Sequence, residues 1–152
     1  MTRLGRRGAA ALEFAFCALP LLALLTLAVE AGWQLAINAA LENGARRASR
    51  LGLTGSTPES GTREQAITRA VLDAAPILQA SRLEVALRAY PGFAALSQPG
   101  AGQAGAGAAG QVVEYRLTYH QPVLGPLARA LWGATVEHAA VTLVQNEAFT
   151  SP

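Results

Sequence analysis

Several residue types are scarce in this chain of 152 residues, and each scarcity excludes a class of protein. A single cysteine, Cys17, excludes an internal disulfide framework and a cysteine-based zinc site. Charged residues make up 14% of the chain, against roughly 25% in ordinary globular domains, while 51% of the residues are apolar. This composition excludes a disordered chain, a coiled-coil rod and a typical cytosolic enzyme. The mean hydropathy of +0.26 indicates that the core is unusually large or that part of the chain lies outside water.

Lysine is absent, and all twelve basic residues are arginine. They exceed the ten acidic residues by two, an excess too small to indicate nucleic acid as a partner, because that partner requires a basic face. The only histidines, His120 and His138, have no Cys or Asp nearby, so we interpret them as strand-end or surface residues rather than metal ligands. No spacing of Ser, His and acidic residues indicates a catalytic site. The sequence therefore predicts no enzyme, no cofactor and no metal.

One long stretch without charge lies near the N-terminus. The sixteen residues from Phe14 to Val29 carry no charge, and with Ala9–Leu12 added across Glu13 the stretch reaches twenty-one residues. As a helix it would be about 32 Å long, enough to cross a hydrocarbon layer of roughly 30 Å. Three arginines and no acid precede it, which by the positive-inside tendency keeps the N-terminus cytoplasmic and exports the remainder. The stretch is therefore a membrane helix over residues 9–29 or a cleaved secretion signal.

The residues that follow favour the membrane helix. A secretion signal ends in a small-x-small site before a structural break; Thr26–Ala28 fits this site weakly, but residues 30–50 contain no proline and continue as a helical pattern. Their apolar residues recur at three- and four-residue spacing, which predicts an amphipathic helix. This stripe consists of Trp33, Ile37, Ala40, Leu41, Ala45 and Ala48.

Glu13 stands at the start of the apolar stretch, where a charged acid needs a partner. A carboxylate in the bilayer centre costs on the order of 3 kcal/mol on insertion scales and usually pairs with another group. Arg6 precedes Glu13 by seven positions, about 10 Å along a helix, so a partner from another chain is the more natural candidate. The alternative is that Glu13 lies at headgroup level with its carboxylate in water.

The residues around Glu13 also carry a resemblance. The segment Arg7–Phe14, RGAAALEF, resembles the class III signal of type IV pilin-like proteins, and its Glu-Phe pair with a short leader resembles the TadE-like minor pseudopilins of the Flp/Tad branch. In that family a membrane-embedded prepilin peptidase cuts after the glycine. The resemblance implies a cut between Gly8 and Ala9, and it implies that Glu13, followed by Phe14, neutralises the new N-terminal amine of a neighbouring subunit.

The resemblance also implies a role and a location. A TadE-like minor pseudopilin is a single-pass protein of the bacterial inner membrane that joins or primes a Flp/Tad pilus or a related secretion filament for adhesion. Its partners would be membrane lipid, prepilin peptidase, other pilins and pseudopilins such as a TadF-like protein, and the Tad secretion machinery. Two other functions stay open at this point: a secreted binding module with an ordinary cleaved signal, and an uncleaved membrane-anchored structural domain.

The part beyond the apolar helix predicts a small α+β body. Thr57 and Pro58 suit a helix start, and Glu64–Leu78 carries apolar residues on one side, with Pro76 expected to bend or end the helix. Alternating patterns predict strands over Leu83–Tyr90, Val112–Tyr119 and Thr135–Gln145. The Gly/Ala-rich residues 97–110 contain a GxGxxG pattern, but a strand rather than a helix is expected after it, so we interpret the segment as a flexible loop.

The predicted organisation has four parts. It comprises a basic leader (1–8), a transmembrane helix (9–29), an amphipathic extension (30–51) and an exported body (52–152). The expected fold class is α+β, with a long N-terminal helix followed by a small antiparallel sheet packed on helices.

Overall fold

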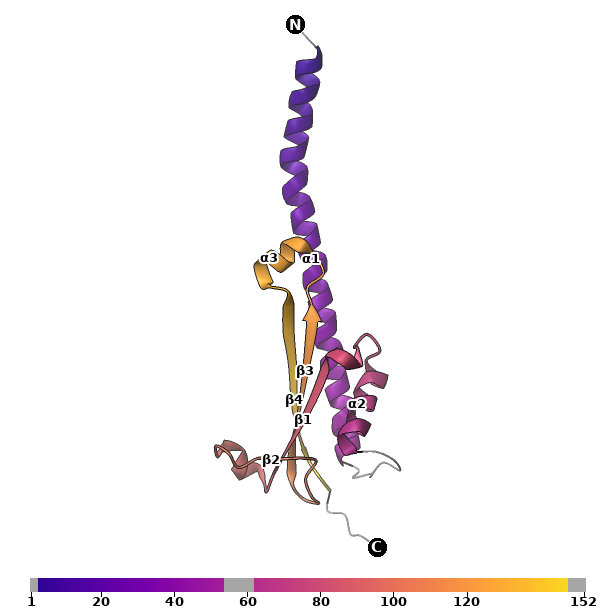
Figure 1. The fold of residues 1–152 in the computed structure, drawn as a ribbon, viewed down its shortest axis with the longest axis vertical. Coiled ribbons are helices and arrows are strands. Elements are labelled where there is room, and N and C mark those ends of the chain that lie inside the picture. The colour runs from indigo at the N-terminus through magenta and orange to yellow at the C-terminus, as the bar shows by residue number, and fades with distance from the viewer. Residues whose placement is uncertain (1–2, 54–61, 148–152) are drawn as a thin grey trace. The chain divides into compact units, whose positions relative to one another are not determined.

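The computed structural model describes residues 3–53 and 62–147 (Figure 1). The chain divides into two compact units, one comprising residues 1–35 and 122–136 and the other residues 36–121 and 137–152. The elements, in chain order, are α1 (Arg3–Leu53), α2 (Arg63–Ala74), the 3-10 helix η1 (Ala80–Arg82), β1 (Leu83–Tyr90), the 3-10 helix η2 (Phe93–Ser97), β2 (Gln103–Ala104), β3 (Val112–Pro122), α3 (Pro126–Trp132) and β4 (Thr135–Gln145). The predicted α+β fold class is confirmed.

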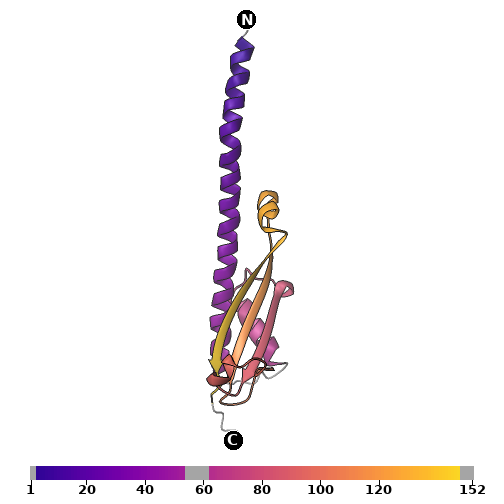
Figure 2. The ribbon, with the colours of Figure 1, turned by 90° about the vertical axis from the view of Figure 1, so that its left-hand side faces the viewer.

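Helix α1 is one continuous element of 51 residues, and it continues through Pro20. Its uninterrupted course is visible in both views (Figure 2). In its N-terminal part the large apolar side chains are exposed, with Phe14 at 74% and Val29 at 70% exposure. Among the described residues this is the one helix long and apolar enough to cross a membrane, with a mean hydropathy of 2.2 in its most apolar part. A helix that is apolar all round requires a nonaqueous environment or apolar partners.

In the unit formed by residues 1–35 and 122–136, α3 is held in a short chain reversal. The Val123 amide donates to the Ala134 carbonyl at 3.0 Å, which joins the two ends of the reversal. Pro126 occupies the first turn of α3, where a missing amide hydrogen costs nothing. The helix ends before Gly133, whose φ of +87° favours glycine.

The second unit contains most of an antiparallel sheet with strand order β2-β1-β3-β4. The three long strands lie side by side in Figure 2. The register pairs Leu87 with Tyr115 and Ala89 with Val113, so these buried side chains share one face. Arg88 pairs with Glu114 on the opposite face, where water is accessible. The alternation predicted for β1 and β3 therefore separates core from solvent, except at the end of the ladder, where the paired Tyr90 and Val112 are buried on the other face.

The C-terminal part of α1 and helix α2 complete this core. Ile37, Leu41, Ala45 and Ala48 of the predicted stripe are buried, while Trp33 and Ala40 are half-buried. A Cβ built on Gly44 would lie 2.6 Å from Val71 Cγ1, so the close approach of α1 and α2 requires a residue without a side chain.

Helix α2 differs from the expected helix at both ends. Its N-cap is Thr62, whose side chain accepts from the Gln65 amide while the Gln65 side chain accepts from the Thr62 amide, a reciprocal capping box. The helix start expected at Thr57 and Pro58 lies outside the described residues. The helix ends at Ala74, two residues before Pro76, as the proline requires.

The predicted strand boundaries are close to those observed. β1 and β4 have the predicted bounds, and β3 extends three residues further, to Pro122. The Gly/Ala-rich segment additionally contains the two-residue strand β2, which pairs with the edge of β1 through Arg88–Ala104 and Ala89–Gln103.

Candidate functional site

The residues of the predicted processing and assembly site lie on the exposed N-terminal part of α1. Gly8, Ala9, Glu13 and Phe14 are all exposed. A Cβ on Gly8 would meet no other atom within 4 Å, so nothing in the fold of this chain requires glycine at this position. Glycine destabilises a helix interior by about 1 kcal/mol relative to alanine. A requirement for glycine at Gly8 would therefore have to come from another molecule.

Glu13 is exposed on a part of α1 surrounded by exposed apolar side chains, which include Leu12, Phe14 and Phe16. Within the part of the chain whose side chains are described, no group forms an ion pair with it. The structure of the single chain thus leaves the Glu13 carboxylate available to a group outside that part.

A second carboxylate, Glu30, forms the most elaborate polar site of the first unit. It is the first charged residue after the apolar stretch, and only 2% of it is exposed. Oε2 accepts hydrogen bonds from the backbone amides of Leu124 at 3.0 Å and Gly125 at 3.1 Å, and Oε1 accepts from Gln34 Nε2 at 2.8 Å. One side chain of α1 thereby fixes the turn that leads into α3.

The Glu30 site is built for an ionised carboxylate. Burial alone would raise the pKa of Glu30, but the hydrogen bonds from Gln34, Gly125 and Leu124 and the positive charge of Arg129 together lower it below the usual 4.5. Arg129 is itself fixed by donation from Nη2 to the Val123 carbonyl at 2.9 Å. The charge is thus stabilised by surrounding donors although it is withdrawn from water.

The Glu30 site was not predicted from the sequence. A partial signal was present, because an acid directly after sixteen uncharged residues, with Gln34 one turn further on, requires an explanation. Its main partners are backbone amides 94 and 95 positions away. No side-chain pattern identifies such partners.

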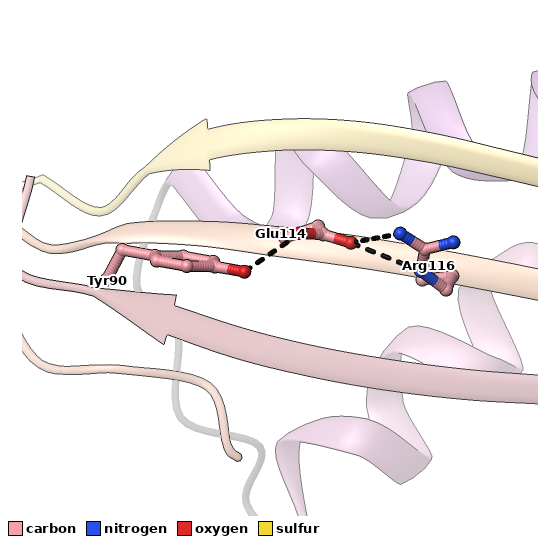
Figure 3. Close-up of polar contacts among 3 residues, drawn as sticks. All are labelled: Tyr90, Glu114 and Arg116. Atoms are coloured by element: carbon pink, nitrogen blue, oxygen red, sulfur yellow. Dashed lines mark hydrogen bonds and ion pairs between the residues drawn. The ribbon is translucent and has the colours of Figure 1, made fainter. Parts of the chain in front are cut away.

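The face of the sheet that carries Arg88 and Glu114 has a smaller polar cluster (Figure 3). Glu114 accepts from the Tyr90 hydroxyl at 3.1 Å and from Nε and Nη2 of Arg116 at 3.2 and 2.8 Å. A Cβ on Gly102 would lie 2.7 Å from the Tyr90 ring, so this glycine allows the segment to pass over the ring. Both carboxylate oxygens of Glu114 accept hydrogen bonds within the cluster. We therefore interpret the cluster as a local stabilising contact.

Two further observations explain the Gly/Ala-rich segment. Gly100 and Gly105 have φ values of +80° and +126°, and no helix follows them, so the GxGxxG pattern reflects backbone conformation rather than a dinucleotide site. The buried Asn146 donates from Nδ2 to the carbonyls of Ala106 and Ala108, both at 3.0 Å. Asn146, which was not predicted as important, thus contacts the segment through two hydrogen bonds from its amide nitrogen.

The histidines lie apart from these sites. His120 is half-buried on β3, with Nε2 3.4 Å from an oxygen of Glu84. His138 is half-buried on β4, and burial lowers its pKa. Across residues 3–53 and 62–147, no three His, Cys, Asp or Glu side chains are grouped so that they could hold a metal ion.

Together these features define an α+β protein with a long apolar N-terminal helix of the kind that serves as a single-pass membrane anchor. Residues 8–50 match the family model of TadE-like proteins, so this segment of the chain is similar to that family. The resemblance stated from the sequence is confirmed, and the family is a structural, pilus-associated one. No curated protein and no solved structure matches the chain. Residues 51–152 lie outside the family match.

Proposed function

We propose that this TadE-like protein is a minor pseudopilin that joins or primes a Flp/Tad-type filament at the bacterial inner membrane. The match over residues 8–50, which includes both Gly8 and Glu13, is the observation that carries the proposal. In this role residues 9–29 of α1 form the single membrane span, the leader is cytoplasmic and the body is extracytoplasmic. The chain is a substrate of prepilin peptidase, and its partners are pilins, pseudopilins and the secretion machinery.

The unexplained glycine at position 8 supports processing after Gly8. A Cβ at position 8 would meet no other atom within 4 Å in this chain, so a protease that accepts glycine before the cut gives the glycine a reason. We expect the protein co-expressed with a prepilin peptidase of a Tad system to begin at Ala9, as measured by mass spectrometry of the intact protein. Gly8→Leu should leave the precursor uncut, and Gly5→Leu, which alters the other leader glycine, should not.

The outcomes of this measurement separate the alternative functions. A mature protein that begins at Val29 or later would be a secreted module released by ordinary signal peptidase. An uncut chain, with no change in size or function after Gly8→Leu, would be a membrane-anchored structural domain. Either result would overturn processing after Gly8.

Exposure of Glu13 on an apolar helix supports its pairing with an amine of a neighbouring subunit. A carboxylate and an amine attract strongly where the dielectric constant is low, and pairing offsets the cost of withdrawing both from water. We expect Glu13→Ala to reduce filament assembly and crosslinking to partner pilins by roughly tenfold or more, since an unpaired buried amine costs several kcal/mol. Glu42→Ala, at an exposed acid further along α1, is the matched control. Unchanged assembly by the Glu13→Ala protein would refute the pairing while leaving the cleavage proposal intact.

A further inference from the structure

Helix α3 and the turn before it present apolar side chains to the outside. Leu124 is 57% exposed, Leu127 41%, Leu131 62% and Trp132 44%. Leu127 and Leu131 are four residues apart on α3 and therefore lie on the same side of the helix, whereas Ala128 is buried. Arg129 is the only charged residue between Gln121 and Val136. Exposure of this apolar surface to water is energetically unfavourable for so short a segment.

Glu30 determines the position of this segment along α1. Its bonds to the Leu124 and Gly125 amides hold the turn at the residue where the apolar stretch of α1 ends. Leu22, Leu25, Thr26 and Val29 of α1 line a hollow together with Leu124, Gly125 and Glu30. The apolar surface therefore continues from the anchor helix onto the turn and α3.

We propose that Leu124–Trp132 lies in the interfacial layer of the membrane that α1 crosses, with lipid as its occupant. Tryptophan and leucine suit the boundary between acyl chains and headgroups, where an indole has both apolar and polar surroundings. Arg129 uses one donor for the Val123 carbonyl, and the other donors of its exposed guanidinium are suited to lipid phosphate. The inference rests on the proposed insertion of α1 and adds a second membrane contact, made by a segment outside the matched residues 8–50.

Lipid is favoured over a protein partner for two reasons. The segment begins at the level of Glu30, so lipid that surrounds the exposed Val29 side chain is adjacent to it. The single charged residue of the segment, Arg129, is positive, which suits anionic headgroups. A second copy of the chain is the competing occupant and is an outcome of the test.

The test uses the two tryptophans of the full-length protein, Trp33 and Trp132. Trp33→Phe leaves Trp132 as the only indole, and the purified variant is reconstituted into phosphatidylcholine–phosphatidylglycerol vesicles containing lipid brominated near the headgroup end of the acyl chain. We expect bromine to reduce Trp132 emission roughly twofold or more and iodide to reduce it little, since an interfacial indole meets lipid rather than water. The control carries Leu143→Trp on β4 with both native tryptophans replaced by phenylalanine; it should respond to iodide and not to bromine.

A positioning variant and an insertion control complete the test. Glu30→Ala should alter bromine quenching of Trp132, because the turn loses its attachment to α1. If iodide quenches Trp132 as strongly as it quenches the Leu143→Trp control, the proposed lipid contact is wrong. The proposal is also wrong if Trp132 is protected from iodide only at high protein-to-lipid ratios, a result that indicates contact with another copy of the chain. Alkaline extraction of the same vesicles reports on α1 separately. Extraction of the protein would overturn the anchor as well, whereas retention with Trp132 in water would overturn only this inference.

Discussion

Glu30 shows how one residue can connect segments that are distant in the sequence. Its carboxylate has lost nearly all contact with water, yet three hydrogen-bond donors and a nearby guanidinium keep it ionised. Hydrogen bonds to a charged group contribute about 1.5–3 kcal/mol each, more than neutral bonds do. The carboxylate thus stabilises a turn whose own side chains are largely exposed.

This account predicts a pH-dependent effect of Glu30→Gln. Because folding lowers the pKa of Glu30, the stabilisation is fully present above about pH 4.5 and is lost as the pH falls through the lowered folded-state pKa. At pH 7 we expect Glu30→Gln to lower the free energy of unfolding by about 1–3 kcal/mol, measured by thermal unfolding in detergent. The difference from the native protein should shrink below pH 4.5.

Glu42→Gln is the control for this prediction, because Glu42 is an exposed glutamate on the same helix whose contacts, a 3.7 Å ion pair to Arg46 and a 3.2 Å hydrogen bond from Asn38, lie at the surface. Its effect should stay below about 0.5 kcal/mol at every pH. Equal effects of the two substitutions, or a pH-independent effect of Glu30→Gln, would show that the charge of Glu30 does not hold the turn.

At the residue scale the sequence predicted patterns but not individual long-range partners. Burial of Ile37 and Leu41 follows from helical periodicity within a few residues. Asn146 and Glu30 owe their burial to backbone groups of the 106–108 and 124–125 segments, and backbone groups are the same at every position. Gly8, Ala9, Glu13 and Phe14 stay predictions, because their proposed partners belong to other molecules.

At the scale of elements, the contact of α1 with α2 depends on the glycine at position 44. Alanine there would place its Cβ 2.6 Å from Val71 Cγ1, and a β-branched side chain on a helix has little freedom to move. Crowding of this kind typically costs 1–3 kcal/mol, whereas alanine gains about 1 kcal/mol in helix propensity. Steric crowding should therefore outweigh propensity.

We expect Gly44→Ala to be less stable than Gly32→Ala by about 1–3 kcal/mol in thermal unfolding. Gly32 is the matched control, because it lies on the same helix and a Cβ there meets nothing within 4 Å. Val71→Ala should remove most of the penalty, which makes the Gly44–Val71 double-mutant cycle strongly non-additive. Similar effects of Gly44→Ala in both backgrounds would contradict the contact.

The elements themselves were predictable where their patterns were strong. The bounds of β1 and β4 follow from alternation, and the end of α2 shortly before Pro76 follows from the proline. The helix start was harder to predict, because the Gly-, Ser- and Thr-rich residues before α2 offer several candidate caps. The reciprocal bonds of Thr62 and Gln65 identify the cap that is used. Strand β2 has only two residues, too few for any alternation to show.

At the scale of the whole molecule, the two units distribute apolar residues in opposite ways. Among the described residues, all buried apolar side chains except Val123 and Ala128 belong to the unit of residues 36–121 and 137–152. Most of the large exposed ones belong to the other unit, in α1 up to Leu35 and in the α3 segment. The second unit thus has the core of a water-soluble domain, and the first has the surface of a membrane-associated one.

This distribution predicts that the second unit folds without the first part of α1. A fragment of residues 36–152 retains Ile37, Leu41, Gly44 and every other buried residue of that unit, so it should unfold cooperatively on heating. It lacks Glu30, so the Leu124 and Gly125 amides should exchange hydrogen rapidly while amides of β1 and β3 stay protected. Fragment 29–152 is the control, because it restores Glu30 and Gln34 and should protect both amides. If fragment 36–152 loses cooperative unfolding while fragment 29–152 keeps it, the turn at Leu124 and Gly125 supports the body as well as α3, and Glu30 stabilises both units.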